Sequence, residues 1–234
     1  MNASRPIEAV LLDLDGTLLD TAPDLIGSLN ELRLEHNLEV LGAGELQPAV
    51  SHGSAPMIRR GFHLDASARD FEPLRQRFLA LYRNRLARDT RPYPGMEQML
   101  AKLEQRGIPW GIVTNKPGWL ARPLLEVLGY DRRAACIVTG DCVARRKPDP
   151  YPILEACRQV GVDPAAVLVL GDAQRDVEAA RRAGALALAA LFGYIGAEDR
   201  VAYWGAHGLL GSPLELLRWL PQPDLPDLGQ PAMA

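Results

Sequence analysis

The chain has 234 residues, 47% of them hydrophobic and 24% charged, which is enough to bury one α/β core with a smaller accessory unit. Its 26 lysine and arginine residues against 29 aspartate and glutamate residues give a net charge of -3, so the overall charge offers no basis for binding nucleic acid or an anionic membrane. The three cysteines, Cys136, Cys142 and Cys157, include no Cys-x-x-Cys pair, which argues against a zinc site and a disulfide framework.

The N-terminal residues lack the apolar segment of a signal peptide, because Asp13 and Asp15 interrupt the nearest apolar run. No stretch approaches the roughly 20 apolar residues that a membrane span needs. We therefore expect a cytoplasmic protein that binds neither membrane nor nucleic acid. The sequence leaves a monomer and a weak homodimer equally open.

The first predicted strand covers residues 10–14 and runs into a glycine at position 16. Helical spacing then dominates between residues 22 and 89, where Leu25, Leu29 and Leu32 recur at helix intervals. Residues 42–44 and 51–54 are expected to be loops between these helices. The sequence thus predicts a small all-α unit over residues 21–92, inserted after the first strand.

From residue 93 onward, predicted helices and strands alternate. Helices are expected over 96–106, 120–128, 152–160 and 177–183, strands over 110–115, 136–139, 167–170 and 186–191, and a last short helix over 214–220. Continuous apolar strands alternating with helices are typical of a parallel sheet covered on both faces. We predict an α/β fold whose core comprises residues 1–20 and 93–234, with residues 221–234 as a poorly ordered tail.

Polar residues gather where these strands end. They are Asp13, Asp15, Thr114, Asn115, Lys147, Asp172 and Asp176. In open parallel sheets the chemistry lies beyond the carboxyl ends of the strands, so these side chains are expected to come together. Two carboxylates as close as Asp13 and Asp15 raise each other's pKa unless a cation or a shared proton relieves them.

Four segments resemble, in the right order, the four motifs of the haloacid dehalogenase superfamily of phosphotransferases: residues 13–20, 113–115, 146–150 and 171–180. The helical insertion lies where that family carries a helical cap. Residues 192–194 and 215–217 also resemble its phosphoglycolate phosphatase-like branch. The resemblance implies a Rossmann-like core with an all-α cap and the activity of a phosphomonoesterase.

The resemblance also implies roles for the acidic residues. Asp13 would be the nucleophile that forms an aspartyl-phosphate, and Asp15 would protonate the leaving oxygen and later activate water. Mg²⁺, which prefers oxygen ligands, would be held by Asp13, the backbone carbonyl of Asp15 and Asp172. Asp176 would orient these ligands.

The remaining motif residues would bind the phosphoryl group. Lys147 would supply positive charge, and the Thr114 hydroxyl with the backbone of Asn115 would supply hydrogen bonds. Ala173 stands where the family frequently has a serine, which removes one hydroxyl near the metal site.

Substrate specificity is expected to reside in the cap segment 50–54, which resembles the cap of N-acetylmuramic acid 6-phosphate phosphatases. His52 and Gly53 are candidates for substrate contact, although a single loop histidine is usually just solvated. Arg59 is a candidate for a substrate carboxylate, although it could equally lie on a helix surface.

Phosphoglycolate is the first expectation for the substrate, and a sugar phosphate such as N-acetylmuramic acid 6-phosphate is the second. A mutase of the β-phosphoglucomutase kind uses the same core and stays open. A haloacid dehalogenase is disfavoured because its chemistry needs neither a metal nor the second aspartate, Asp15. The rival from another class is a receiver-like phosphoacceptor, which also gathers carboxylates, a hydroxyl and a lysine around Mg²⁺ but is short and lacks a cap.

Overall fold

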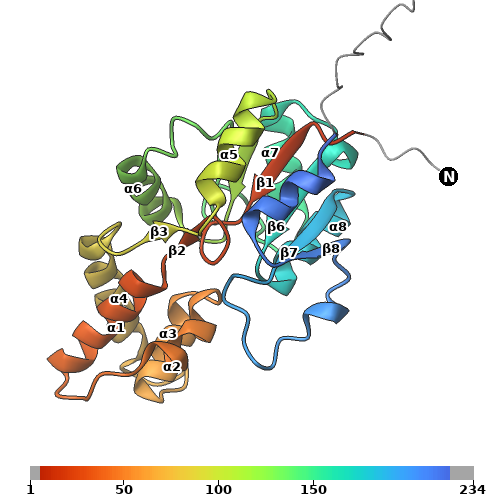
Figure 1. Cartoon of the computed structure of the whole chain (residues 1–234). Helices are drawn as coiled ribbons and strands as arrows, with labels where there is room; N and C mark the ends of the chain where they lie inside the picture. Colours follow the sequence, from red (N-terminus) through yellow and green to blue (C-terminus); the bar gives the residue numbers. More distant parts are fainter. Residues whose placement is uncertain (1–5, 222–234) are drawn as a thin grey trace, which may run out of the picture.

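A six-stranded parallel sheet forms the centre of the protein (Figure 1). The computed structural model describes residues 6–221, and the account below concerns that part of the chain. The strands lie in the order β5 (Ile137–Val138), β4 (Trp110–Val113), β1 (Ala9–Leu12), β6 (Val167–Gly171), β7 (Leu186–Ala190) and β8 (Gly208–Leu210). Every neighbouring pair is parallel, which confirms the predicted α/β fold.

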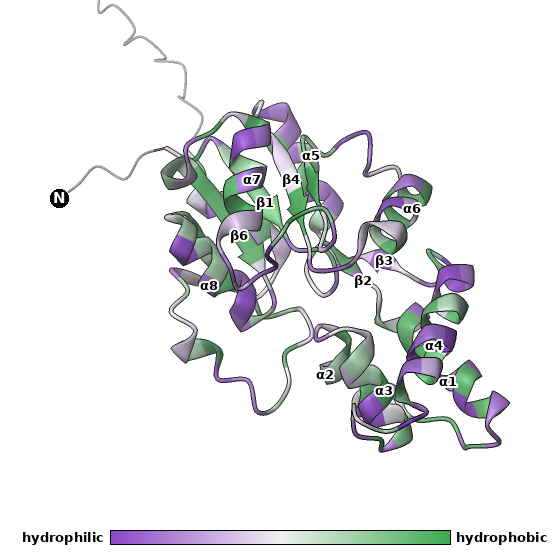
Figure 2. Cartoon of the chain, turned by 180° about the vertical axis from the view of Figure 1, so that it is seen from behind, coloured by the Kyte–Doolittle hydropathy of each residue, from purple (hydrophilic) through white to green (hydrophobic). Residues whose placement is uncertain are grey.

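Helices cover both faces of this sheet, so β1 is buried on both sides. Val10 and Leu12 belong to a core cluster with residues of α5 (Met96–Gln105) and α6 (Gly118–Leu128). Ala9 and Leu11 belong to a second cluster with residues of α7 (Tyr151–Val160) and α8 (Gln174–Ala183). In Figure 2 the strands of the sheet are coloured mainly as hydrophobic, whereas the helices carry both hydrophobic and hydrophilic residues. A strand buried on both faces needs an unbroken apolar run, and residues 9–12 supply one.

The four helices that follow β1 directly form a separate unit beyond the carboxyl edge of the sheet, which we call the cap (Figure 1). They are α1 (Ala22–Glu35), α2 (Ala43–Val50), α3 (Ser54–Phe62) and α4 (Phe71–Arg85). Their apolar faces enclose a core of their own, in which Leu29, Met57 and Phe78 are almost fully buried. Leu120 of α6 and Tyr194 join this cluster from the sheet side, so the hydrophobic core of the cap extends to the strand ends.

Two short strands connect the cap to the sheet and pair with each other. β2 (Leu19–Asp20) leads into the cap, and β3 (Arg91–Pro92) leads out of it in the antiparallel direction. Asp24 is fully buried at the start of α1, and it links the segment that enters the cap to the segment that leaves it. Its carboxylate accepts hydrogen bonds from the backbone N–H groups of Asp89 and Thr90. The Thr90 hydroxyl donates to the same carboxylate at 2.7 Å.

Several local features differ from the sequence prediction. β8 was missed because it has only three residues and begins with glycine, and the β2–β3 pair was missed because each strand has two. The prediction of a loop at residues 42–44 is wrong, since α2 begins at Ala43 and Gly42 is the N-terminal capping residue of that helix. The last helix, Pro213–Trp219, is of the 3₁₀ type. The tail predicted for residues 221–234 lies outside the described residues except for Pro221.

Candidate active site

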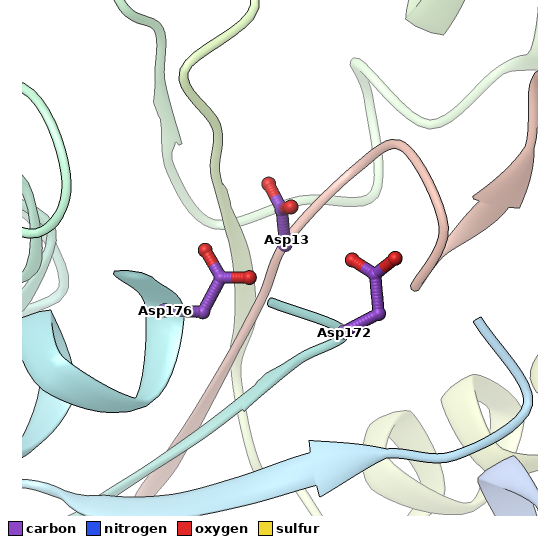
Figure 3. A group of neighbouring side chains, drawn as sticks. All are labelled: Asp13, Asp172 and Asp176. Carbon is purple, nitrogen blue, oxygen red and sulfur yellow. The ribbon is translucent and has the colours of Figure 1, made fainter. Parts of the chain in front are cut away.

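Three buried aspartates meet at the carboxyl edge of the sheet (Figure 3). Asp13 follows β1, Asp172 follows β6, and Asp176 lies in the first turn of α8. One carboxylate oxygen from each lies within 4.8 Å of the others. Parallel strands end at the same edge, so residues distant in the sequence share one site here, as the strand pattern predicted.

Lys147 lies between two of these aspartates. Its Nζ is 2.8 Å from Asp13 Oδ1 and 2.7 Å from Asp176 Oδ1, and it also donates to the Val113 carbonyl at 2.6 Å. The side chain of Asn115 holds the Lys147 backbone in place with two hydrogen bonds, of 2.9 and 3.0 Å. Sequence reasoning gave Asn115 only a backbone role, and the structure adds this positioning of Lys147.

The buried carboxylates carry more negative charge than Lys147 neutralises. Burial disfavours every anion here, and it raises the pKa of Asp13. At Asp172, burial together with repulsion from Asp13 and Asp176 raises the pKa to about 7. At Asp176 burial is outweighed by the attraction of Lys147 and Arg175, so its pKa is lowered. A hard divalent cation would relieve this repulsion, and a donor set of carboxylate oxygens suits one.

The turn after β1 packs closely against Asp172, because two glycines stand where any side chain would collide with it. A Cβ on Gly16 would lie 2.1 Å from Asp172 Oδ2, and Gly16 has φ +85°, which disfavours other residues. A Cβ on Gly193 would lie 2.3 Å from the Asp172 Cβ. The space so gained lets the Tyr194 N–H donate to Asp172 Oδ2 at 2.9 Å.

Asp15 belongs to a different network from the three clustered aspartates. Its Oδ1 accepts hydrogen bonds from the Thr21 hydroxyl at 2.6 Å and from Lys116 Nζ at 2.8 Å. Lys116 Nζ also donates to the hydroxyl of Tyr82, on α4 of the cap, at 2.9 Å. Burial opposes the charge on Lys116, but Asp15 and Tyr82 together outweigh it and raise the pKa of the lysine. Burial raises the pKa of Tyr82 to about 12.

A cavity of about 740 Å³ separates the cap from the sheet edge. Asp13, Asp15, Thr114, Asn115 and Lys116 line its sheet side. Its cap side combines apolar and polar residues: Val50, Ser51, His52, Gly53, Ser54, Met57, Arg75, Gln76, Phe78, Leu79 and Tyr82. The Thr114 hydroxyl oxygen accepts the Lys116 N–H at 3.1 Å, so its proton remains available to a ligand.

The cap contacts the acidic cluster directly. The Ser51 hydroxyl donates to Asp172 Oδ2 at 2.7 Å, and Arg175 Nη2 donates to the Ser51 carbonyl at 2.7 Å. Burial and the neighbouring Arg175 lower the pKa of His52. The loop between α2 and α3 is thereby held over the site.

The structure brings most of the sequence candidates together and leaves one outside. His52 and Gly53 line the cavity, whereas Arg59 lies exposed on α3 and is not among the lining residues. Arg75 of α4 lines it instead. The sequence patterns single out neither Arg75 nor Lys116, although Lys116 directly follows the second motif.

Comparison with known proteins shows which family the chain belongs to. Residues 10–190 match the haloacid dehalogenase-like hydrolases. The chain belongs to this family. A structure of a predicted phosphoglycolate phosphatase from Haemophilus somnus superposes with a TM-score of 0.80 at 25% identity, over 91% of this chain and 97% of the other.

Relatives of this haloacid dehalogenase-like hydrolase include phosphatases of two substrates. An N-acetylmuramic acid 6-phosphate phosphatase from Pseudomonas aeruginosa is 44% identical over 211 residues, which is 90% of this chain and 93% of the relative. A phosphoglycolate phosphatase from Xanthomonas campestris is 44% identical over 214 residues, 91% of this chain and 95% of the relative. The chain is thus a phosphatase of this family. Within residues 6–221 we find no helix with the length and apolar character that crossing a membrane requires.

The close approach of Gly16 to Asp172 yields a testable prediction. Gly16→Ala should reduce phosphatase turnover by about 100-fold, because the new methyl group must displace Asp172 or the turn that carries Asp15. Gly44→Ala is the matched control, since Gly44 lies inside α2 with no atom near its added Cβ. Steady-state kinetics of both variants checks this, and equal activities would show that the turn adapts freely.

Proposed function

We propose that the protein is a Mg²⁺-dependent phosphomonoester hydrolase that works through an aspartyl-phosphate on Asp13. The observation that carries this proposal is the division of labour between two aspartates of one turn. Both line the cavity, but Asp13 is fixed by Lys147 inside the acidic cluster, whereas Asp15 belongs to a separate network. One carboxylate is thus suited to attack and the other to move a proton.

In the proposed first step, Asp13 attacks the phosphorus atom. Its Oδ1 is bound to Lys147, which leaves Oδ2 to form the bond. The bond to the ester oxygen breaks, and that oxygen takes a proton from Asp15. In the second step water attacks the phosphoryl group, Asp15 takes the proton of the water, and phosphate leaves with the Asp13 carboxylate restored. Thr114 donates a hydrogen bond to the phosphoryl oxygens, and Lys147 supplies positive charge.

Asp13, the backbone carbonyl of Asp15 and Asp172 would hold Mg²⁺, and Asp176 would orient the site through Lys147. When bound, the ion neutralises the charge of the phosphate and the carboxylates, so that two anions can approach each other. The surplus of buried negative charge around Asp172 supports this assignment.

We further propose that the substrate is a phosphorylated carboxylic acid of sugar size. Phosphoglycolate and N-acetylmuramic acid 6-phosphate, named for the relatives above, both carry a phosphate ester and a carboxylate. The lining includes Arg75, Arg146 and Arg175, cations beyond those assigned to the phosphate. Phosphoglycolate, with about 9 non-hydrogen atoms, would occupy a small part of a cavity of about 740 Å³, whereas a ligand of about 24 such atoms suits pockets of this size. The volume favours N-acetylmuramic acid 6-phosphate.

The nucleophile assignment predicts that Asp13→Asn lowers turnover at least about 1000-fold, since an amide cannot form the acyl-phosphate. The measurement is phosphate release from a panel of phosphomonoesters with Mg²⁺, with unfolding temperature as the check on folding. Residual turnover near that of the unmodified protein would refute the role of Asp13. An unmodified protein that hydrolyses none of the panel would refute the proposed function.

The metal assignment predicts a pH-dependent stabilisation by Mg²⁺. Because the pKa of Asp172 is raised to about 7, a bound cation must displace its proton at lower pH. At about 100 times its dissociation constant, Mg²⁺ should add about 2.7 kcal/mol to the free energy of unfolding. The gain should be larger at about pH 8 than at about pH 5.5. Thermal unfolding with and without Mg²⁺ measures it, and Asp172→Asn should abolish it.

The substrate assignment predicts a ranking of catalytic efficiencies. N-acetylmuramic acid 6-phosphate should exceed N-acetylglucosamine 6-phosphate, which lacks the lactyl carboxylate, by about 10- to 100-fold in kcat/KM. It should also exceed phosphoglycolate, which keeps a carboxylate but is small. Arg75→Gln should reduce the first ratio. A preference for phosphoglycolate would contradict the argument from size, and equal rates on both sugars would contradict the argument from charge.

A further inference from the structure

Lys116 is a buried cation to which the steps above give no role. Its ammonium is the meeting point of the second motif, the turn after β1 and the cap, since Nζ contacts Asp15 at 2.8 Å and the Tyr82 hydroxyl at 2.9 Å. The same Nζ lies 4.6 Å from the centroid of the Tyr82 ring. Only 9% of the residue is exposed, so these contacts are made away from bulk water, where they are strong.

The contact with Lys116 distinguishes the two oxygens of Asp15. Lys116 and Thr21 both donate to Oδ1, and within residues 6–221 no hydrogen bond is made to Oδ2. With two donors on one oxygen, the carboxylate has a fixed rotamer, and Oδ2 is left for the ester oxygen or water. Loss of Lys116 would leave Thr21 alone, a single donor that permits rotation of the carboxylate.

The contact with Tyr82 makes this orientation depend on the cap. Tyr82 lies on α4, whereas Lys116 and Asp15 lie on the sheet side. Lys116 directly follows the Thr114-Asn115 pair, and its backbone N–H is held by the Thr114 hydroxyl oxygen. The ammonium is therefore fixed at its base by the phosphate-binding segment and at its tip by the cap.

We propose that Lys116 is the positioning residue of the acid and base Asp15, and that Tyr82 completes this positioning when the cap covers the site. The inference rests on the proposed function, because it assigns Asp15 the proton transfer. It adds that the proton-transferring group is oriented by the substrate-enclosing cap.

The leaving group of the substrate provides a selective test. A sugar alkoxide is a poor leaving group and requires the proton of Asp15, whereas p-nitrophenolate leaves without one. A residue that acts through Asp15 must therefore matter for the sugar phosphate and hardly for p-nitrophenyl phosphate. The quantity to compare is kcat/KM, because it covers the steps up to departure of the leaving group and is unaffected by the later attack of water.

Lys116→Met should lower kcat/KM for N-acetylglucosamine 6-phosphate by about 100-fold and that for p-nitrophenyl phosphate by less than about 5-fold. Tyr82→Phe, which removes only the hydroxyl, should lower the first value by about 3- to 10-fold and leave the second nearly unchanged. Lys102→Met is the matched control, since Lys102 lies on α5 and, among the described residues, its ammonium donates a hydrogen bond only to Gln105. Thermal unfolding reports whether each variant folds.

Equal losses on both substrates would overturn the inference and leave the proposed function standing. A loss confined to N-acetylmuramic acid 6-phosphate, with N-acetylglucosamine 6-phosphate unaffected, would also overturn it, because Lys116 would then bind the substrate carboxylate. If Lys116→Met does not fold, the same pair of substrates with Tyr82→Phe decides, and equal losses there overturn the inference. Absence of turnover by the unmodified protein would overturn the proposed function and this inference with it.

Discussion

The structure depends on the burial of several carboxylates at one edge of a parallel sheet. Burial and mutual repulsion disfavour the anions of Asp13 and Asp172, and Lys147 compensates only part of this. The surrounding features follow from that constraint. Glycines clear the approach to Asp172, and the side chain of Asn115 holds the backbone of Lys147. Clustered, buried carboxylates with perturbed pKa values are typical of functional sites.

The cap is joined to this edge by contacts that run through the site itself. Tyr194 shows this most clearly, because its N–H holds Asp172 while its hydroxyl donates to Asp20 and accepts the N–H of Ala22. Ser51 adds a contact from the cap loop to the same Asp172. Cap position and the geometry of the acidic cluster are therefore coupled by direct hydrogen bonds. In our proposal Lys116 extends the coupling to Asp15.

In our proposal, the reaction and the substrate specificity reside in different parts of the chain. The sheet edge supplies the charges that a phosphomonoester requires, whatever its alcohol. The cap supplies shape and one additional cation, Arg75, for the rest of the substrate. This separation explains how relatives of equal identity to this chain can be named for substrates as different as phosphoglycolate and N-acetylmuramic acid 6-phosphate. In our proposal, substrate choice depends on the cap side of the cavity, which is lined mainly by α3, α4 and the loop between α2 and α3.

The sequence alone determined the parallel sheet and the set of polar residues at its edge, because strand ends converge wherever apolar strands alternate with helices. Short elements such as β8 carried too little pattern to be found. The contact of Lys116 with Tyr82, the exclusion of Arg59 from the cavity and the cavity volume were decided by tertiary structure. They depend on how the cap packs against the sheet. Local sequence patterns do not specify which residues of the cap and of the sheet come into contact.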